Sequence, residues 1–125
     1  MPEAQTPFRL VQVALRVLDL ERAIAFYRDV LGLPFLFRAE PGMAFFDLDG
    51  VRLLLGTVEA SGPLERSTPL YLGATDIAAT ARRMRAAGVT FHKEPALIAR
   101  MPEREVWLAE FVDSEGNVMA LMEER

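Results

Sequence analysis

Cysteine is absent from the 125 residues of the chain. Disulfide bonds, thiolate metal sites and cysteine nucleophiles are therefore excluded. Long apolar runs are also lacking, since no stretch approaches the roughly 20 residues needed to cross a bilayer. The first seven residues contain neither the basic region nor the apolar segment of a signal peptide. With 51% hydrophobic and 26% charged residues, residues 1–125 are expected to form one globular, cytoplasmic domain with no membrane partner.

Acidic residues outnumber basic ones by 18 to 14, and the net charge is −4. Nucleic acid is therefore not expected as a partner, because phosphate binding requires a concentrated basic surface. The one local cluster, Arg82, Arg83 and Arg85, falls on an expected helix and is interpreted as its solvated face. Histidine occurs once, at His92, where a surface or hydrogen-bonded structural role is favoured over that of a catalytic base.

The chain contains an internal repeat, in which each copy begins with a strand followed by a helix. In the first copy, residues 11–17 alternate between apolar and polar, Asp19 is an expected N-cap, and Gly32 ends the helix. Residues 70–75 begin the second copy in the same way, with Asp76 and Gly88 at the corresponding places. The capping residue and the closing glycine are 13 positions apart in one copy (32 − 19) and 12 in the other (88 − 76).

Three short strands are expected after each helix. They are residues 34–39, 43–48 and 51–55 in the first copy, and residues 90–93, 106–112 and 118–122 in the second. Asp49-Gly50 is a predicted hairpin turn, residues 96–105 a predicted loop, and residues 57–68 a predicted linker. The sequence thus predicts an α+β fold of two βαβββ modules, at about residues 9–56 and 69–123, whose cupped mixed sheets surround a cleft.

Several segments also resemble a known family. Residues 13–17 (VALRV), 19–23 (DLERA), 26–32 (FYRDVLG) and 111–121 (FVDSEGNVMAL) resemble the opening module and final hairpin of the vicinal-oxygen-chelate superfamily, of the glyoxalase/bleomycin-resistance/dioxygenase type. This superfamily includes isomerases, epimerases, ring-cleaving dioxygenases, thiol transferases and non-catalytic drug-binding proteins. The resemblance therefore predicts one fold, but it does not distinguish among these functions.

The resemblance further implies four metal-ligand positions, at the first and last strands of each module. They fall on Gln12, Leu54, Pro69 and Ala120. Only Gln12 carries a donor atom, a neutral carbonyl oxygen, whereas a divalent cation needs about three or four donors with charge among them. We therefore expect no metal and no cofactor.

Strand alternation predicts which residues line the cleft. The expected set is Gln12, Ala14, Arg16, Arg52, Leu54, Tyr71, Leu108, Glu110, Ala120 and Met122. If Trp107 and Ala109 face the helix, alternation turns Glu110 toward the cleft. Glu110 and Tyr71 are the candidate acid-base residues of this set.

The leading functional interpretation is a metal-free, non-catalytic protein that sequesters a small hydrophobic or aromatic molecule, resembling the bleomycin-resistance branch and its role in antibiotic resistance. One alternative is a metal-dependent, glyoxalase-like lyase or isomerase, or a dioxygenase-related enzyme. Another is a metal-free enzyme that uses Glu110 or Tyr71 as acid or base. A homodimer is expected, because dimers are common in this superfamily. The sequence does not distinguish a dimer whose modules pair within each chain from one whose modules are swapped between chains.

Overall fold

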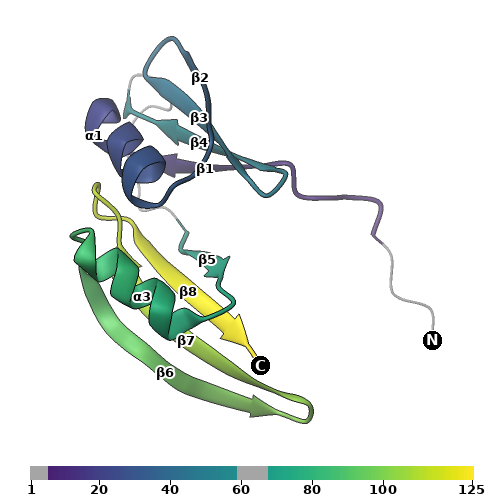
Figure 1. Ribbon diagram of the computed structural model, residues 1–125. Helices are drawn as coiled ribbons and strands as arrows, with labels where there is room; N and C mark the ends of the chain where they lie inside the picture. Colours follow the sequence, from purple (N-terminus) through teal and green to yellow (C-terminus); the bar gives the residue numbers. More distant parts are fainter. Residues whose placement is uncertain (1–5, 59–67) are drawn as a thin grey trace.

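Two four-stranded mixed sheets form the frame of the protein in a computed structural model, which describes residues 6–58 and 68–125 (Figure 1). The first sheet has the order β1-β4-β3-β2 and the second the order β5-β8-β7-β6. Their strands are β1 (Gln12–Arg16), β2 (Phe35–Ala39), β3 (Met43–Leu48), β4 (Val51–Gly56), β5 (Leu70–Gly73), β6 (Phe91–Met101), β7 (Arg104–Val112) and β8 (Val118–Glu124). The predicted repeat is thus confirmed as module one (β1 to β4) and module two (β5 to β8).

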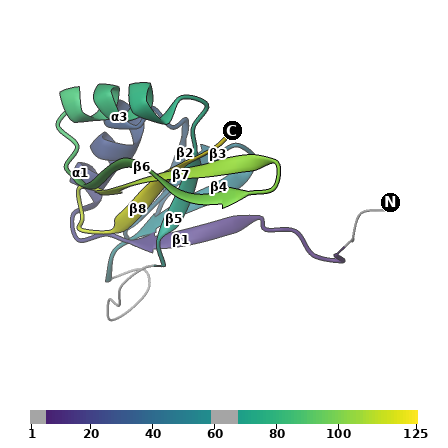
Figure 2. The same cartoon turned by 90° about the horizontal axis from the view of Figure 1, so that it is seen from below.

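One helix follows the first strand of each module, α1 (Leu20–Ala25) in module one and α3 (Ile77–Ala86) in module two. α1 continues directly into a π-helix, η1 (Phe26–Val30). Both helices lie on the same side of the sheets (Figure 2). Buried side chains of both helices form one continuous apolar core with inward residues of both sheets, such as Leu53 and Phe111. A single core therefore serves both modules.

The predicted helix boundaries are confirmed by the capping geometry. The side-chain oxygens of Asp19 and Asp76 each accept a hydrogen bond of 3.0 Å from a backbone N–H three residues later. Gly32 and Gly88 follow the helical segments with φ of +77° and +98°. Such positive φ values favour glycine, because a Cβ atom would be strained there.

The segment expected to form a loop, residues 96–105, is instead mostly strand. β6 extends to Met101 and β7 begins at Arg104, so only a tight turn separates them. Within this hairpin Ala96 pairs with Leu108 and Leu97 with Trp107. The loop prediction was wrong because β6 contains several register shifts. These irregularities interrupt the period-two pattern by which a strand is recognised in sequence.

The predicted linker, residues 57–68, lies largely outside the described residues. Thr57 continues from β4, and its backbone N–H donates a hydrogen bond of 3.0 Å to the carbonyl oxygen of Gly42. In the part of the chain that the structure describes, no helix is long and apolar enough to cross a membrane.

The sheet faces opposite the helices, here called the open faces, are not covered by any described helix. Phe37 on the first sheet is 46% exposed, and Tyr71 on the second is 60% exposed. On β7, Ala109 and Phe111 are buried in the core, which turns Glu110 to the open face. In the part of the chain that the structure describes, the two sheets stay open and do not curl around a closed cleft (Figure 1).

Candidate functional site

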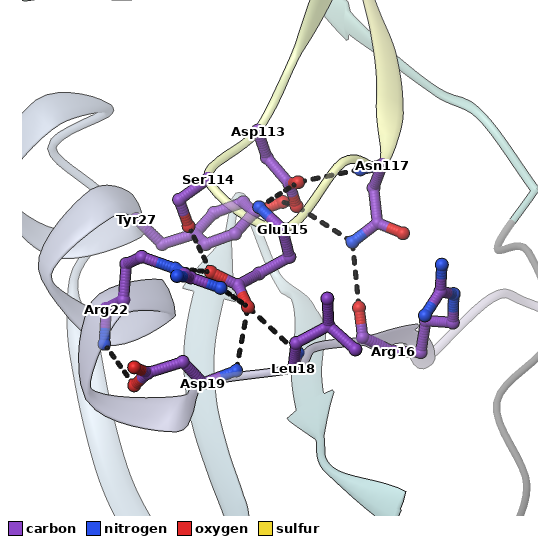
Figure 3. A network of polar contacts seen from close by, with 9 residues as sticks. All are labelled: Arg16, Leu18, Asp19, Arg22, Tyr27, Asp113, Ser114, Glu115 and Asn117. Atoms are coloured by element: carbon purple, nitrogen blue, oxygen red, sulfur yellow. Dashed lines mark hydrogen bonds and ion pairs between the residues drawn. The ribbon is translucent and has the colours of Figure 1, made fainter.

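The loop of residues 113–117 in module two packs against module one through a polar network (Figure 3). Asp113, which is 5% exposed, lies at its centre. Its carboxylate accepts hydrogen bonds from the Tyr27 hydroxyl at 2.6 Å, from the backbone N–H groups of Glu115 and Asn117 at 2.8 Å, and from Nδ2 of Asn117 at 2.9 Å. Burial and the nearby charge of Asp113 raise the pKa of Tyr27, so Tyr27 remains a neutral donor.

Glu115 binds the start of α1 from the same loop. Its Oε1 atom accepts hydrogen bonds of 2.8 Å from the backbone N–H groups of Leu18 and Asp19. The guanidinium of Arg22 donates to both carboxylate oxygens, at 2.7 and 3.0 Å, and the Ser114 hydroxyl donates at 2.8 Å. Burial raises the pKa of Glu115, but these hydrogen bonds outweigh it and lower the pKa from 4.5 to about 2. Arg22, Tyr27, Asp113, Glu115 and Asn117 are hereafter called the junction network.

A pocket of about 500 Å³, the junction pocket, lies beside this network. Its described lining includes three polar residues, Arg16, His92 and Asn117, and three apolar ones, Pro69, Val112 and Val118. Arg16 ends β1 of module one, whereas the other residues belong to module two. Asn117 joins network and pocket, because its Nδ2 atom also donates a hydrogen bond of 2.8 Å to the backbone oxygen of Arg16. The pocket therefore forms where the two open faces meet.

Three other hollows have described linings that come from one module each. A hollow of about 640 Å³ in module one includes Leu18 and Arg38, and Arg38 is ion-paired with Glu21. None of the ten predicted cleft residues lines it. Tyr71 and Met122, which belong to the predicted set, line a hollow of about 530 Å³ in module two. Of the hollows described here, only the junction pocket has described lining residues from both modules.

The predicted cleft residues of module one lie together on its open face. Gln12 and Ala14 pair with Arg52 and Leu54, respectively, across β1 and β4. The Nε atom of Arg52 donates a hydrogen bond of 2.8 Å to Oε1 of Gln12. The Arg52 guanidinium also lies 5.8 Å from the ring centroid of Phe45. Arg52 is therefore held by module one itself, through a hydrogen bond and a cation–π contact.

The predicted residues of module two form two rows on the second open face. Tyr71, Ala120 and Glu110 are neighbours across β5, β8 and β7, and Leu108 pairs with Met122 in the next row. Among the described residues, Glu110 has no hydrogen-bond or ion-pair partner. Ala120, between Tyr71 and Glu110, is only 5% exposed, so this part of the face is covered by its neighbours.

The four predicted metal-ligand positions divide into two pairs, one in each module. Gln12 and Leu54 lie on the first open face, whereas Pro69 and Ala120 belong to module two. The only donor oxygen, that of Gln12, already binds the cationic Arg52, whose charge opposes a metal ion. Among residues 6–58 and 68–125, no group of three or more His, Asp or Glu side chains could hold a metal ion. These residues do not fit the divalent metal implied by the family resemblance.

Sequence reasoning missed the junction network, because residues 111–121 were considered only for their resemblance to a final hairpin. A sequence signal was available in Tyr27, which follows the apolar Ala23 and Ile24 by four and three residues, the spacing of one helix face. A buried tyrosine hydroxyl requires a hydrogen-bond partner. Its partner, Asp113, is 86 residues away in the sequence, so local patterns could not identify it.

Comparison with known proteins agrees with this architecture. The model of the Glyoxalase/Bleomycin resistance protein/Dioxygenase superfamily matches residues 9–121. One similar solved structure is lactoylglutathione lyase from Agrobacterium tumefaciens, with 24% identity, a TM-score of 0.75, and coverage of 94% of this chain and 95% of that chain. Another is UcmS2, with 28% identity, a TM-score of 0.73, and coverage of 94% of this chain and 98% of that chain. A superfamily member from Sphaerobacter thermophilus is also similar (24%, 93% and 97%, TM-score 0.75). No curated protein sequence matches the chain. Since the family match spans nearly the whole sequence, the chain belongs to the Glyoxalase/Bleomycin resistance protein/Dioxygenase superfamily.

Proposed function

We propose that the protein binds a small hydrophobic or aromatic molecule in the junction pocket, without a metal ion. The main support for this proposal is the pocket itself. It has a volume of about 500 Å³, and apolar residues and a few polar side chains line it. Ligand pockets are commonly of roughly 300–1,000 Å³ and have this kind of lining. Val112 and Val118 supply apolar surface, while Arg16 and Asn117 can orient the ligand.

The junction network supports binding by holding the pocket in shape. Asn117 donates to Asp113 and to the Arg16 backbone, so residues of both modules are fixed relative to one another. Asp113 is in turn fixed by Tyr27 from η1. A wall that is already ordered lowers the entropic cost of binding.

A second candidate function, acid-base catalysis without a metal, is favoured by one observation. Glu110 has no partner among the described residues and stands across Ala120 from Tyr71. A substrate bound against this face could exchange a proton with the carboxylate. If this candidate is right, Glu110→Gln should abolish turnover of a bound compound while its dissociation constant stays within about twofold. Turnover by Glu110→Gln at the parent rate would contradict it.

We also propose that the protein is a homodimer in which a second copy covers exposed parts of the open faces. Tyr71 and Phe37 are large apolar side chains that are 60% and 46% exposed in the single chain. A stable interface should bury more than roughly 1,000 Å² in total. Light scattering at micromolar concentration should give twice the chain mass, 14.0 kDa per chain. A single-chain mass would contradict the dimer.

A thermal-shift screen of aromatic metabolites and drugs, performed with a chelator, tests the main proposal. A ligand at 100 times its dissociation constant should stabilise the folded protein by about 2.7 kcal/mol. Val118→Phe, which fills the pocket, should abolish the shift, whereas Val58→Phe, at a position 52% exposed, should retain it. Hits that require a metal, or that stabilise Val118→Phe as strongly as the parent, would contradict the proposal.

A further inference from the structure

We infer that Trp107 and Glu123 form a binding site for a guanidinium group, which Arg125 occupies until a small guanidinium compound displaces it. This site is separate from the junction pocket and does not depend on the proposed function. It lies at the end of β8 marked C in Figure 1. Trp107 precedes Val112 of the pocket lining by five residues on β7, which corresponds to roughly 17 Å along the strand.

The aromatic part of the site is the indole ring of Trp107. The guanidinium of Arg125 lies over this ring, 4.3 Å from its centroid. This distance is within the roughly 6 Å at which a ring attracts a cation, and tryptophan is the side chain that attracts cations most strongly. The ring packs on the apolar core, and its Nε1–H group donates a hydrogen bond of 3.1 Å to Oε1 of Glu105. The ring is therefore already oriented for a cation.

The charged part of the site is the carboxylate of Glu123, which pairs with Trp107 across β7 and β8. Its side chain is only 11% exposed, and its Oε2 atom lies 3.3 Å from Nε of Arg125. The other oxygen, Oε1, accepts a hydrogen bond of 2.8 Å from the backbone N–H of Ile77 at the start of α3. The carboxylate is therefore fixed in place. Because a buried carboxylate is costly without a cation beside it, the site favours a positive charge.

The backbone of Arg125 is fixed, but its side chain is accessible. The residue exchanges two backbone hydrogen bonds with Glu105, whereas its side chain is 52% exposed. The guanidinium can therefore leave the ring without loss of the backbone pairing at this position. A group attached to a short tether acts at an effective concentration in the millimolar range. A free guanidinium compound is thus expected to compete with Arg125 at comparable concentrations.

The combination of ring and carboxylate favours a guanidinium over other cations. A guanidinium is planar, so it can stack on the face of Trp107 while its N–H groups donate to Glu123. A tetramethylammonium ion has no N–H group and can use only the ring. A neighbouring ion pair offers a comparison, because Arg104 and Glu124 lie 2.6 Å apart at the same end of β7 and β8, with side chains 54% and 39% exposed.

The test titrates methylguanidinium chloride into the protein while the fluorescence of Trp107, the only tryptophan of the chain, is recorded. Arg125→Ala removes the internal occupant, and the matched control Arg104→Ala removes the neighbouring exposed ion pair. Arg125→Ala should respond at concentrations roughly tenfold lower than the parent and the control. At ten times its dissociation constant, the compound should also raise the unfolding midpoint of Arg125→Ala by about 3–6 °C. Sodium chloride at equal concentration controls for ionic strength.

Several outcomes would overturn the inference. If the parent responded at the same concentration as Arg125→Ala, Arg125 would not be the occupant of the site. A fluorescence response of Arg125→Ala no larger than that to sodium chloride would show that no such site exists. Tetramethylammonium should bind more weakly, and equal binding would overturn the assignment to a guanidinium. The parent is a second measurement in case Arg125→Ala does not fold: it should show a saturable response to methylguanidinium, and the lack of one would overturn the inference.

Discussion

Replacing Glu115 by glutamine tests how strongly the junction network joins the two modules. The substitution keeps the size of the side chain but removes its charge, and one of its two acceptor oxygens becomes an amide donor. Arg22 then loses its charge partner, and the Ser114 hydroxyl, which donates to Oε2 at 2.8 Å, loses its acceptor if the amide group takes that place. The variant should therefore be less stable than the parent at pH 7.

The magnitude follows from the pKa of Glu115. Its value of about 2 in the folded protein, against 4.5 as the reference, corresponds to roughly 3 kcal/mol of stabilisation. Because the folded pKa is the lower one, this stabilisation is fully present above pH 4.5 and is lost as the pH falls toward 2. We therefore expect Glu115→Gln to cost about 2–3 kcal/mol at pH 7 and progressively less below pH 4.5.

Urea unfolding, followed by the fluorescence of Trp107 and by circular dichroism at several pH values between 7 and 3, measures this difference. Glu21→Gln is a matched control, because Glu21 also pairs with an arginine near α1 but its side chain is 74% exposed. Exposed ion pairs contribute about 0–1 kcal/mol, so the control should change little. A Glu115→Gln variant as stable as the parent at pH 7, or a difference that does not shrink in acid, would refute this account of the network.

Three further outcomes are expected. Tyr27→Phe removes the donor of the 2.6 Å hydrogen bond to Asp113 and should cost about 1.5–3 kcal/mol in urea unfolding; a cost below about 0.5 kcal/mol would show that the bond contributes little. Leu53→Ala, at a fully buried position of the shared core, should cost about 2–5 kcal/mol and still unfold in a single transition, whereas two separate transitions would mean that the modules unfold independently. Elemental analysis of the purified protein should find no stoichiometric zinc, nickel, iron or manganese, because Leu54, Pro69 and Ala120 offer no ligands; about one metal ion per chain would contradict this.

The features that could be predicted from the sequence are those set by neighbouring residues. Asp19 and Asp76 each cap a helix through a backbone N–H only three residues away. Strand alternation likewise placed Glu110 on the open face, since its neighbours Ala109 and Phe111 are apolar and buried. Because the pattern occurs twice at matching spacing, the two modules could be predicted as well.

The features that escaped prediction depend on contacts between distant or irregular segments. Arg22 and Glu115 are 93 residues apart, and no local pattern connects them. The register shifts of β6 concealed a strand that continues through residues 96–101. The stacked pair of Phe37 and Phe45, with ring centroids 4.5 Å apart, arises from the pairing of β2 with β3. The junction pocket is of the same kind, because Arg16 reaches it from one module and Val118 from the other.

A crystal structure of the protein with a compound identified in the thermal-shift screen tests the proposed function most directly. The account predicts electron density for the compound in the junction pocket, in contact with Val112 and Val118 and next to Arg16, with no metal ion bound to it. Density for the compound at another site, or at a metal ion held by the protein, would contradict the account.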